Sequence, residues 1–206
     1  MPAASTRGGT VRLWRVFPWN RRALPGQAYS PASVAPRQKQ GGGRFDLPEL
    51  TSTLYLAETP EHGYAEFLQD FRTQILTRAH LKRNRHPLAH VSVDVPLEVF
   101  HSLPNLADPE TLQRYDIRPD VLSLPRPHRR TTQAIARQIW DDSQAGLRWW
   151  SAFHGEWHTT VLFTERVPLD LLNFGTPTVA TLRDRAVVAG AHAAGMRLRG
   201  SHRPGL

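Results

Sequence analysis

The stretch from Gly41 to Leu68 constrains the fold more than any other part of this chain, because three local signals follow one another within it. It begins with three consecutive glycines, which allow backbone conformations and close approaches that a Cβ atom would forbid. A run of β-branched, aromatic and aliphatic residues, Thr53–Ala57, has the composition of a short strand. Thr59 and Pro60 then have the residue types of a helix N-cap and a first helical position. The stretch therefore predicts a loop, a strand and a capped helix in succession.

Three side chains of this stretch have complementary chemistry. Arg44 follows the glycines and offers a planar fork that suits a phosphate or a carboxylate. Tyr55 lies in the predicted strand, and Glu66 lies in the second turn of the predicted helix, where the helix dipole favours a charged carboxylate. Together they suit a ligand that combines phosphate, an aromatic base and a cationic sugar. Each also has a plainer interpretation: Arg44 as part of a flexible loop, Tyr55 as a packed strand residue and Glu66 as a solvated helix residue.

The rest of the chain shows alternating strand and helix signals. The helix from Pro60 is expected to continue to Arg78–His80, and a long loop is expected at Asn20–Gln40. Further strands are expected at 11–17, 88–95, 146–151 and 157–163, the last two forming an antiparallel hairpin, and further helices at 109–115, 131–143 and 178–194. This order predicts an α+β domain.

Composition narrows the class of protein. The chain has 206 residues, a length that suits one domain, and it has no cysteine, which excludes disulfides and thiolate metal sites and suits the cytoplasm. No apolar run is long enough to span a bilayer, and no secretory signal is expected at the N-terminus. We expect residues 1–10 to be disordered, residues 11–195 to form a single domain and residues 196–206 to form a flexible tail.

The formal net charge is +8, and nearly all the cations are arginines. This balance suits an anionic partner, although an arginine-rich composition alone is weak evidence for nucleic-acid binding. The ten histidines do not form a helical metal motif, since His154 and His158 straddle Gly155, so no metal is expected. A phosphate-binding P-loop, a dinucleotide-binding glycine motif and a serine nucleophile elbow are also absent from the sequence.

Four segments carry a resemblance to a known family. GGGRF at 41–45 and LYLAETPEHGYAEFL at 54–68 resemble the core signature of the RES domain family, as do Leu13–Phe17 and Gly146–Ser151. The resemblance spans roughly Val11 to Phe163. It implies an ADP-ribosyltransferase-like α+β fold with antiparallel sheets flanked by helices and a nucleotide cleft. It also implies a toxin that acts on NAD as its substrate and pairs with a cognate Xre-like antitoxin.

The resemblance also implies roles for individual residues. Arg44 would hold the phosphates or the ribose, Tyr55 would frame the nicotinamide, Glu66 would stabilise the cationic ribose, and Ser151 would orient the substrate or Glu66. Arg15 is a candidate second phosphate contact, or else an exposed strand residue. The acceptor stays open: water gives a glycohydrolase, phosphate gives a phosphorylase, and a protein side chain gives an ADP-ribosyltransferase.

Two other classes of function compete with this one. A basic nucleic-acid-binding module is suggested by Arg129–Arg130 and by the cluster Lys82–Arg85, and it predicts duplex affinity that falls steeply with salt. An inactive scaffold is the third alternative, against which the set Arg44, Tyr55, Glu66 and Ser151 argues. Under the leading hypothesis we expect no direct contact with nucleic acid or membrane, and a possible oligomer that forms through the antitoxin.

Overall fold

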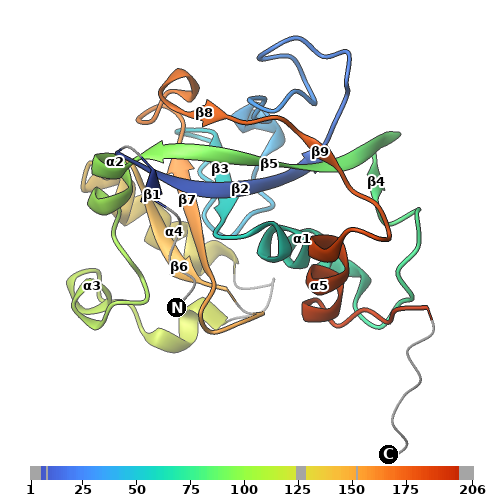
Figure 1. The fold of residues 1–206 in the computed structure, drawn as a ribbon. Helices are drawn as coiled ribbons and strands as arrows, with labels where there is room; N and C mark the ends of the chain where they lie inside the picture. Colours follow the sequence, from blue (N-terminus) through green and yellow to red (C-terminus); the bar gives the residue numbers. More distant parts are fainter. Residues whose placement is uncertain (1–5, 8, 124–128, 152, 200–206) are drawn as a thin grey trace, which may run out of the picture.

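The computed structural model describes residues 6–7, 9–123, 129–151 and 153–199, and shows an antiparallel sheet flanked by helices (Figure 1). This confirms the predicted α+β architecture. None of the helices within these ranges is long and apolar enough to cross a membrane.

The sheet consists of two well-paired halves. In one half, β2 (Thr10–Pro18) pairs antiparallel with β5 (His86–Pro96) along its whole length. In the other half, β3 (Thr53–Ala57) pairs with β7 (His158–Phe163), which pairs with β6 (Gly146–Trp150) as the predicted hairpin. In the described part of the chain, β2 and β3 share one register pair, Trp14 with Ala57. The two halves therefore diverge from a single junction.

Four two-residue strands extend the edges of this sheet: β1 (Thr6–Arg7) on β2, and β4 (Lys82–Arg83), β8 (Asn173–Phe174) and β9 (Thr178–Val179) on β5. Within the described ranges the 3-10 helices are η1 (Arg37–Lys39), η2 (Gln69–Phe71), η3 (Pro119–Ser123) and η5 (Leu169–Leu171).

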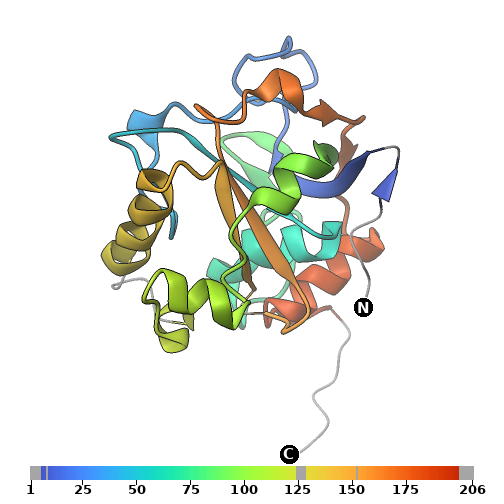
Figure 2. The same ribbon diagram turned by 90° about the vertical axis from the view of Figure 1, so that its left-hand side faces the viewer.

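The helices cover the sheet from different sides. The α-helices are α1 (Pro60–Leu68), α2 (Leu97–Ser102), α3 (Pro109–Arg114), α4 (Arg129–Asp141) and α5 (Arg185–Ala193). α1 packs against α5 near β2, whereas α4 packs against the β6–β7 hairpin (Figures 1 and 2). The helix starts follow the expected capping rules: the side chains of Thr59 and Asp108 accept hydrogen bonds from the backbone of His62 and Thr111, and each cap precedes a proline.

Alternation along the long strands builds the largest core cluster. Val11, Leu13 and Phe17 of β2 are buried on one face together with alternate residues of β5, as the sequence pattern predicted. Two further clusters lie beneath α4 and between α1 and α5.

The structure corrects three predicted helices. α1 ends at Leu68 instead of near Arg78–His80, since the backbone turns out of the helix after η2 and Thr73 takes a φ of 70°. The following segment instead bonds to the C-terminal residues, through Leu76 N–H to Arg197 O at 2.8 Å. Ile75 falls on the apolar face of the predicted helix by its spacing from Tyr64, Phe67, Leu68 and Phe71, yet it is 44% exposed.

α4 spans Arg129–Asp141 instead of the predicted 131–143, and its buried residues are Thr132, Ile135, Ala136 and Ile139. The segment 178–194 begins as β9 and becomes helical at Arg185, where the Asp184 side chain caps α5. Within the segment 1–10, expected to be disordered, Thr6 and Arg7 pair with β2, and within 196–206, expected to be a flexible tail, Met196 is buried.

Candidate active site

A cavity of about 330 Å³ opens where β2 and β3 diverge. Its lining comes from β2, the glycine loop, β3, α1, the start of α4 and the β6–β7 hairpin: Trp14, Val16, Gly42, Gly43, Arg44, Tyr55, Leu56, Ala57, Gly63, Glu66, Phe67, Gln69, Arg129, Trp149 and Thr159. Arg44, Tyr55 and Glu66 are therefore brought together as predicted from the sequence. The loop 20–40 supplies no lining residue among those described.

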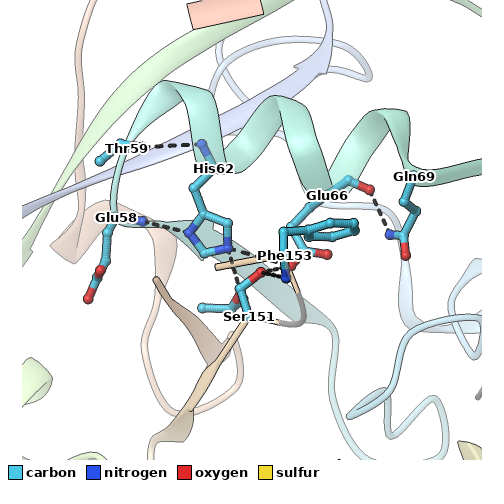
Figure 3. Close-up of polar contacts among 8 residues, drawn as sticks. Glu58, Thr59, His62, Glu66, Gln69, Ser151 and Phe153 are labelled. Carbon is cyan, nitrogen blue, oxygen red and sulfur yellow. Dashed lines mark hydrogen bonds and ion pairs between the residues drawn. The ribbon is translucent and has the colours of Figure 1, made fainter. Parts of the chain in front are cut away.

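Glu66 is held by a serine from the other side of the cavity. Ser151, buried just beyond the end of β6, donates its hydroxyl hydrogen bond to Glu66 Oε1 at 2.9 Å (Figure 3). The Ser151 oxygen in turn accepts a hydrogen bond from the Phe153 backbone N–H at 3.2 Å. The Glu66 side chain keeps about a third of its surface exposed, so it is fixed in direction and still reachable from the cavity. The fourth residue of the predicted set, Ser151, thus contacts the carboxylate directly.

A buried histidine supports the same carboxylate. His62 lies one helical turn before Glu66, is fully buried, and stacks on Trp157 with ring centroids 5.1 Å apart. Its Nδ1 accepts the Glu58 backbone N–H at 3.4 Å, so in the neutral ring the proton is on Nε2. That Nε2 lies 3.5 Å from Glu66 Oε1 and 3.2 Å from Thr159 Oγ1. His62 therefore presents a donor to the site without being exposed in it.

The glycine loop is fastened to the strand behind it by Asp46. The Asp46 carboxylate accepts hydrogen bonds from the N–H groups of Gly41 and Gly43 and from the hydroxyls of Thr53 and Tyr55, all at 2.7–2.8 Å. Burial by itself would raise the pKa of Asp46, but these four hydrogen bonds outweigh it and hold the pKa below its usual value. A Cβ on Gly43 would come within 2.3 Å of the Tyr55 hydroxyl oxygen, so only glycine fits there.

Tyr55 is a fixed wall of the cavity. Its hydroxyl donates to Asp46 and accepts the Phe45 N–H at 3.1 Å, and its ring meets Trp149 edge to face. Burial and the nearby Asp46 carboxylate raise the pKa of Tyr55 well above its usual value. The phenol is therefore neutral and serves as a surface, with no role as a proton-transfer group at neutral pH.

Two guanidinium groups and three further aromatic rings complete the cavity. Arg44 and Arg129 are the cations of its lining, and the other rings are Trp14, Phe67 and Trp149. The backbone of Arg44 is anchored to α4, because Thr132 Oγ1 donates to the Arg44 carbonyl at 2.6 Å. The site therefore has one carboxylate against two cations, with flat apolar faces between them.

Arg15 is not part of this group. It follows Trp14 in β2, so its side chain lies on the opposite face of the strand from Trp14 and Val16, which line the cavity. Its guanidinium donates to the Pro31 carbonyl at 2.7 Å and lies 5.2 Å from the Phe17 ring centroid. Burial lowers the pKa of Arg15 to about 10. The structure thus assigns Arg15 to anchoring the loop at 20–40 and corrects its predicted place at the substrate.

Sequence reasoning missed Asp46, His62, Trp14 and Arg129. Asp46 follows the glycine triplet closely, where a carboxylate is well placed to accept loop N–H groups, and His62 is four residues before Glu66 on one helix face. These spacings were available signals. Trp14 and Arg129 reach the cavity through tertiary packing, which no local spacing indicates. The described residues contain no cluster of three or more histidine, aspartate or glutamate side chains that suits a metal ion.

Comparison with solved structures finds a similar backbone. A chain in the crystal structure of the M. tuberculosis MbcT–MbcA toxin–antitoxin complex superimposes with a TM-score of 0.55 and 17% sequence identity, covering 90% of each chain. At this identity the likeness concerns the fold. No curated protein matches the chain. The sequence profile of the RES domain matches residues 12–177, about four fifths of the chain and all of the cavity-lining residues. The chain therefore belongs to the RES domain family.

Proposed function

We propose that this protein is the toxin of a toxin–antitoxin pair and that it cleaves the nicotinamide–ribose bond of NAD. One observation carries the proposal: the Glu66 carboxylate, oriented by Ser151 at 2.9 Å, lines a cavity whose other charged lining groups are arginines. A carboxylate paired with phosphate-binding cations suits a substrate that is cationic at its sugar and anionic at its diphosphate.

The bond to be broken joins the ribose C1′ carbon to the nicotinamide nitrogen. As it breaks, its electron pair leaves with nicotinamide, which departs as a neutral molecule, and positive charge develops on the ribose as in glycoside cleavage. Glu66 would stabilise that charge electrostatically, and Ser151 and His62 would keep its carboxylate aimed at it. With water as acceptor, the products are nicotinamide, ADP-ribose and one proton.

The aromatic lining suits the leaving group. Tyr55, Trp149 and Trp14 offer ring faces or edges within the same cavity as Glu66, and a planar nicotinamide can pack against such surfaces. Arg44 and Arg129 would bind the diphosphate. A cavity of about 330 Å³ is near the lower end for ligand sites, so we expect it to enclose the nicotinamide and ribose while the adenosine extends outwards.

Proton NMR of the purified protein with NAD tests this proposal. The wild type should release free nicotinamide, and Glu66→Gln, which keeps the shape and removes the charge, should lower turnover by about 10²–10³. Glu110→Gln is the matched control, because Glu110 is exposed in the first turn of α3 and does not line the cavity. Wild-type turnover by a folded Glu66→Gln variant would contradict the assignment.

The same experiment identifies the acceptor. Reactions run with and without inorganic phosphate distinguish ADP-ribose from a phosphorylated ribosyl product. Labelled NAD incubated with cell extract would reveal transfer to protein, which is the ADP-ribosyltransferase alternative. The nicotinamide signal is common to all three, so the ribosyl product decides among them.

The proposal of a protein partner rests on the comparison with solved structures. The similar solved structure is of a toxin–antitoxin complex, and an enzyme that depletes cytoplasmic NAD needs a neutraliser. We therefore expect a cognate Xre-like antitoxin to bind the protein and block the cavity. Expression of the chain alone should arrest growth and lower cellular NAD, co-expression with the antitoxin should restore both, and Glu66→Gln should be harmless from the outset.

A further inference from the structure

A second concave region, separate from the cavity, lies beside α5. Two neighbouring hollows of about 730 Å³ and 540 Å³ share Arg78 and Leu182 in their linings, and the two together are called the groove below. Its lining comes from the segment that follows η2, the segment leading into α5, α5 itself and the residues after α5. Figure 1 shows where these segments lie in the fold. No residue in its lining also lines the active-site cavity.

The walls of this groove are held together by backbone hydrogen bonds. Arg197 pairs with the opposite segment in both directions, donating its N–H to Gln74 O and accepting from Leu76 N–H, each at 2.8 Å. Thr73 N–H donates to Gly195 O at 2.9 Å. These hydrogen bonds hold two of the segments that line the groove side by side, although they are far apart in the sequence.

The floor of the groove is apolar and reachable. Ile75 is 44% exposed and Leu182 is 37% exposed, and both are among the few large aliphatic side chains with such exposure. Leu198 and Val188 line the same hollow and are partly buried. Apolar side chains gathered in a concave surface lose unfavourable contact with water when another apolar surface covers them.

The rim of the groove is basic. Arg78, Lys82, Arg183 and Arg199 line it, and all four are exposed. Its described lining contains no carboxylate to balance them. Four cations around one apolar floor create a positive potential that a partner with acidic side chains would complement.

We infer that this groove binds an acidic amphipathic segment of a partner protein, with apolar side chains on the floor and carboxylates at the rim. The floor argues against nucleic acid, whose outward face is phosphate and sugar. The charge argues against this chain itself as the occupant: residues 200–206 contain Arg203 and no acidic residue, and a second copy carries the same net charge of +8. This inference does not depend on the reaction at Glu66.

A labelled model peptide tests the inference by fluorescence anisotropy. The probe is an amphipathic peptide of leucine and glutamate, with leucines at helical spacing on one face. It should bind the wild type, whereas the same peptide with lysine in place of glutamate should bind at least about tenfold more weakly. Leu182→Glu, which puts a carboxylate on the floor, and the double variant Arg78→Glu, Arg183→Glu should each weaken the leucine–glutamate peptide by about tenfold or more.

Matched controls lie elsewhere on the surface. Leu171→Glu changes a leucine that is 54% exposed and outside the groove, and the double variant Arg21→Glu, Arg22→Glu changes net charge by the same amount as the rim variant. Both should leave affinity within about twofold. Absence of binding to the wild type, equal binding of the lysine peptide, or equal losses in the controls would overturn the inference. Displacement of the peptide by duplex DNA through the same four cations would overturn the inference and identify the groove as a nucleic-acid site.

Discussion

Substitution of Asp46 by asparagine is a direct test of how the glycine loop is held. Each Asp46 oxygen accepts two hydrogen bonds: Oδ1 from the hydroxyls of Thr53 and Tyr55, and Oδ2 from the backbone N–H groups of Gly41 and Gly43. Asparagine keeps one acceptor oxygen and replaces the other by an NH₂ group. Because hydroxyls can accept as well as donate, the NH₂ group should turn toward Thr53 and Tyr55 while the oxygen keeps the two glycine N–H groups.

The expected cost follows from that rearrangement. Hydrogen bonds to a charged group are worth about 1.5–3 kcal/mol and neutral ones about 0.5–1.5 kcal/mol. In Asp46→Asn the hydrogen bonds from the two glycine N–H groups go to a neutral acceptor, and the hydrogen bonds with the two hydroxyls must reverse direction. Because the variant no longer buries a charge, part of this loss in stability is offset. We expect Asp46→Asn to lower the free energy of unfolding by about 1–3 kcal/mol. Asp46→Ala removes the acceptor of all four hydrogen bonds, including those from the Gly41 and Gly43 N–H groups, and should lower it by about 3–5 kcal/mol.

Urea unfolding at two pH values checks both the size and the origin of this effect. Because the folded-state pKa of Asp46 is depressed, its stabilisation is present above the unfolded-state pKa of about 3.9 and is lost as pH falls through the folded-state pKa. The difference between the wild type and Asp46→Asn should therefore be full at pH 7 and shrink below about pH 4. Asp120→Asn, which removes an exposed charge, is the control. A difference below about 0.5 kcal/mol at pH 7, or one that does not change with pH, would refute the reasoning.

Two further substitutions probe the site. Gly43→Ala forces a Cβ within 2.3 Å of the Tyr55 hydroxyl oxygen and 2.5 Å of Asp46 Oδ1, so we expect it to lower the free energy of unfolding by about 2–3 kcal/mol. Gly42→Ala, whose Cβ would lie 3.9 Å from the Arg129 guanidinium, should be nearly neutral by thermal unfolding. His62→Leu removes the Nε2 donor near Glu66, so kcat for NAD cleavage should fall about tenfold or more with little change in KM. His62→Gln retains a donor, and its kcat should lie closer to that of the wild type. Equal kcat values for the two variants would exclude the donor role.

Short-range patterns predicted much of the fold. Thr59 and Asp108 cap helices as expected because capping depends on a few consecutive residues. The alternation in β5 was recovered because burial on one face of a long strand imposes a period of two on the sequence. For the site, the grouping of Arg44, Tyr55 and Glu66 came from one continuous stretch together with the resemblance to a family.

Other features depend on tertiary contacts that no local pattern contains. The residues after α1 have helical periodicity, yet they leave the helix to pair with Arg197, more than a hundred positions away in the sequence. Arg15 has the residue type of a phosphate ligand, but its place on the strand directs it away from the cavity. The spacing of Asp46 from the glycine triplet is a local signal, but its contacts with the hydroxyls of Thr53 and Tyr55 depend on how the loop packs on β3.

Glu66 lies at the cavity because of the way the sheet divides. Because β2 and β3 share only the Trp14–Ala57 pair in the described structure, the strands separate beyond it and leave a space that α1 must border. α5 holds α1 there, and it can do so only because Gly190 has no side chain: a Cβ at that position would lie 2.5 Å from Tyr64 Cβ. α1 thereby carries Glu66 to the cavity, and the end of β6 carries Ser151 to meet it at 2.9 Å. The carboxylate is thus oriented by α1, which packs on β2, and by the end of β6 in the other half of the sheet, so a change in the angle between the halves should act on the Glu66–Ser151 contact before it acts on either core.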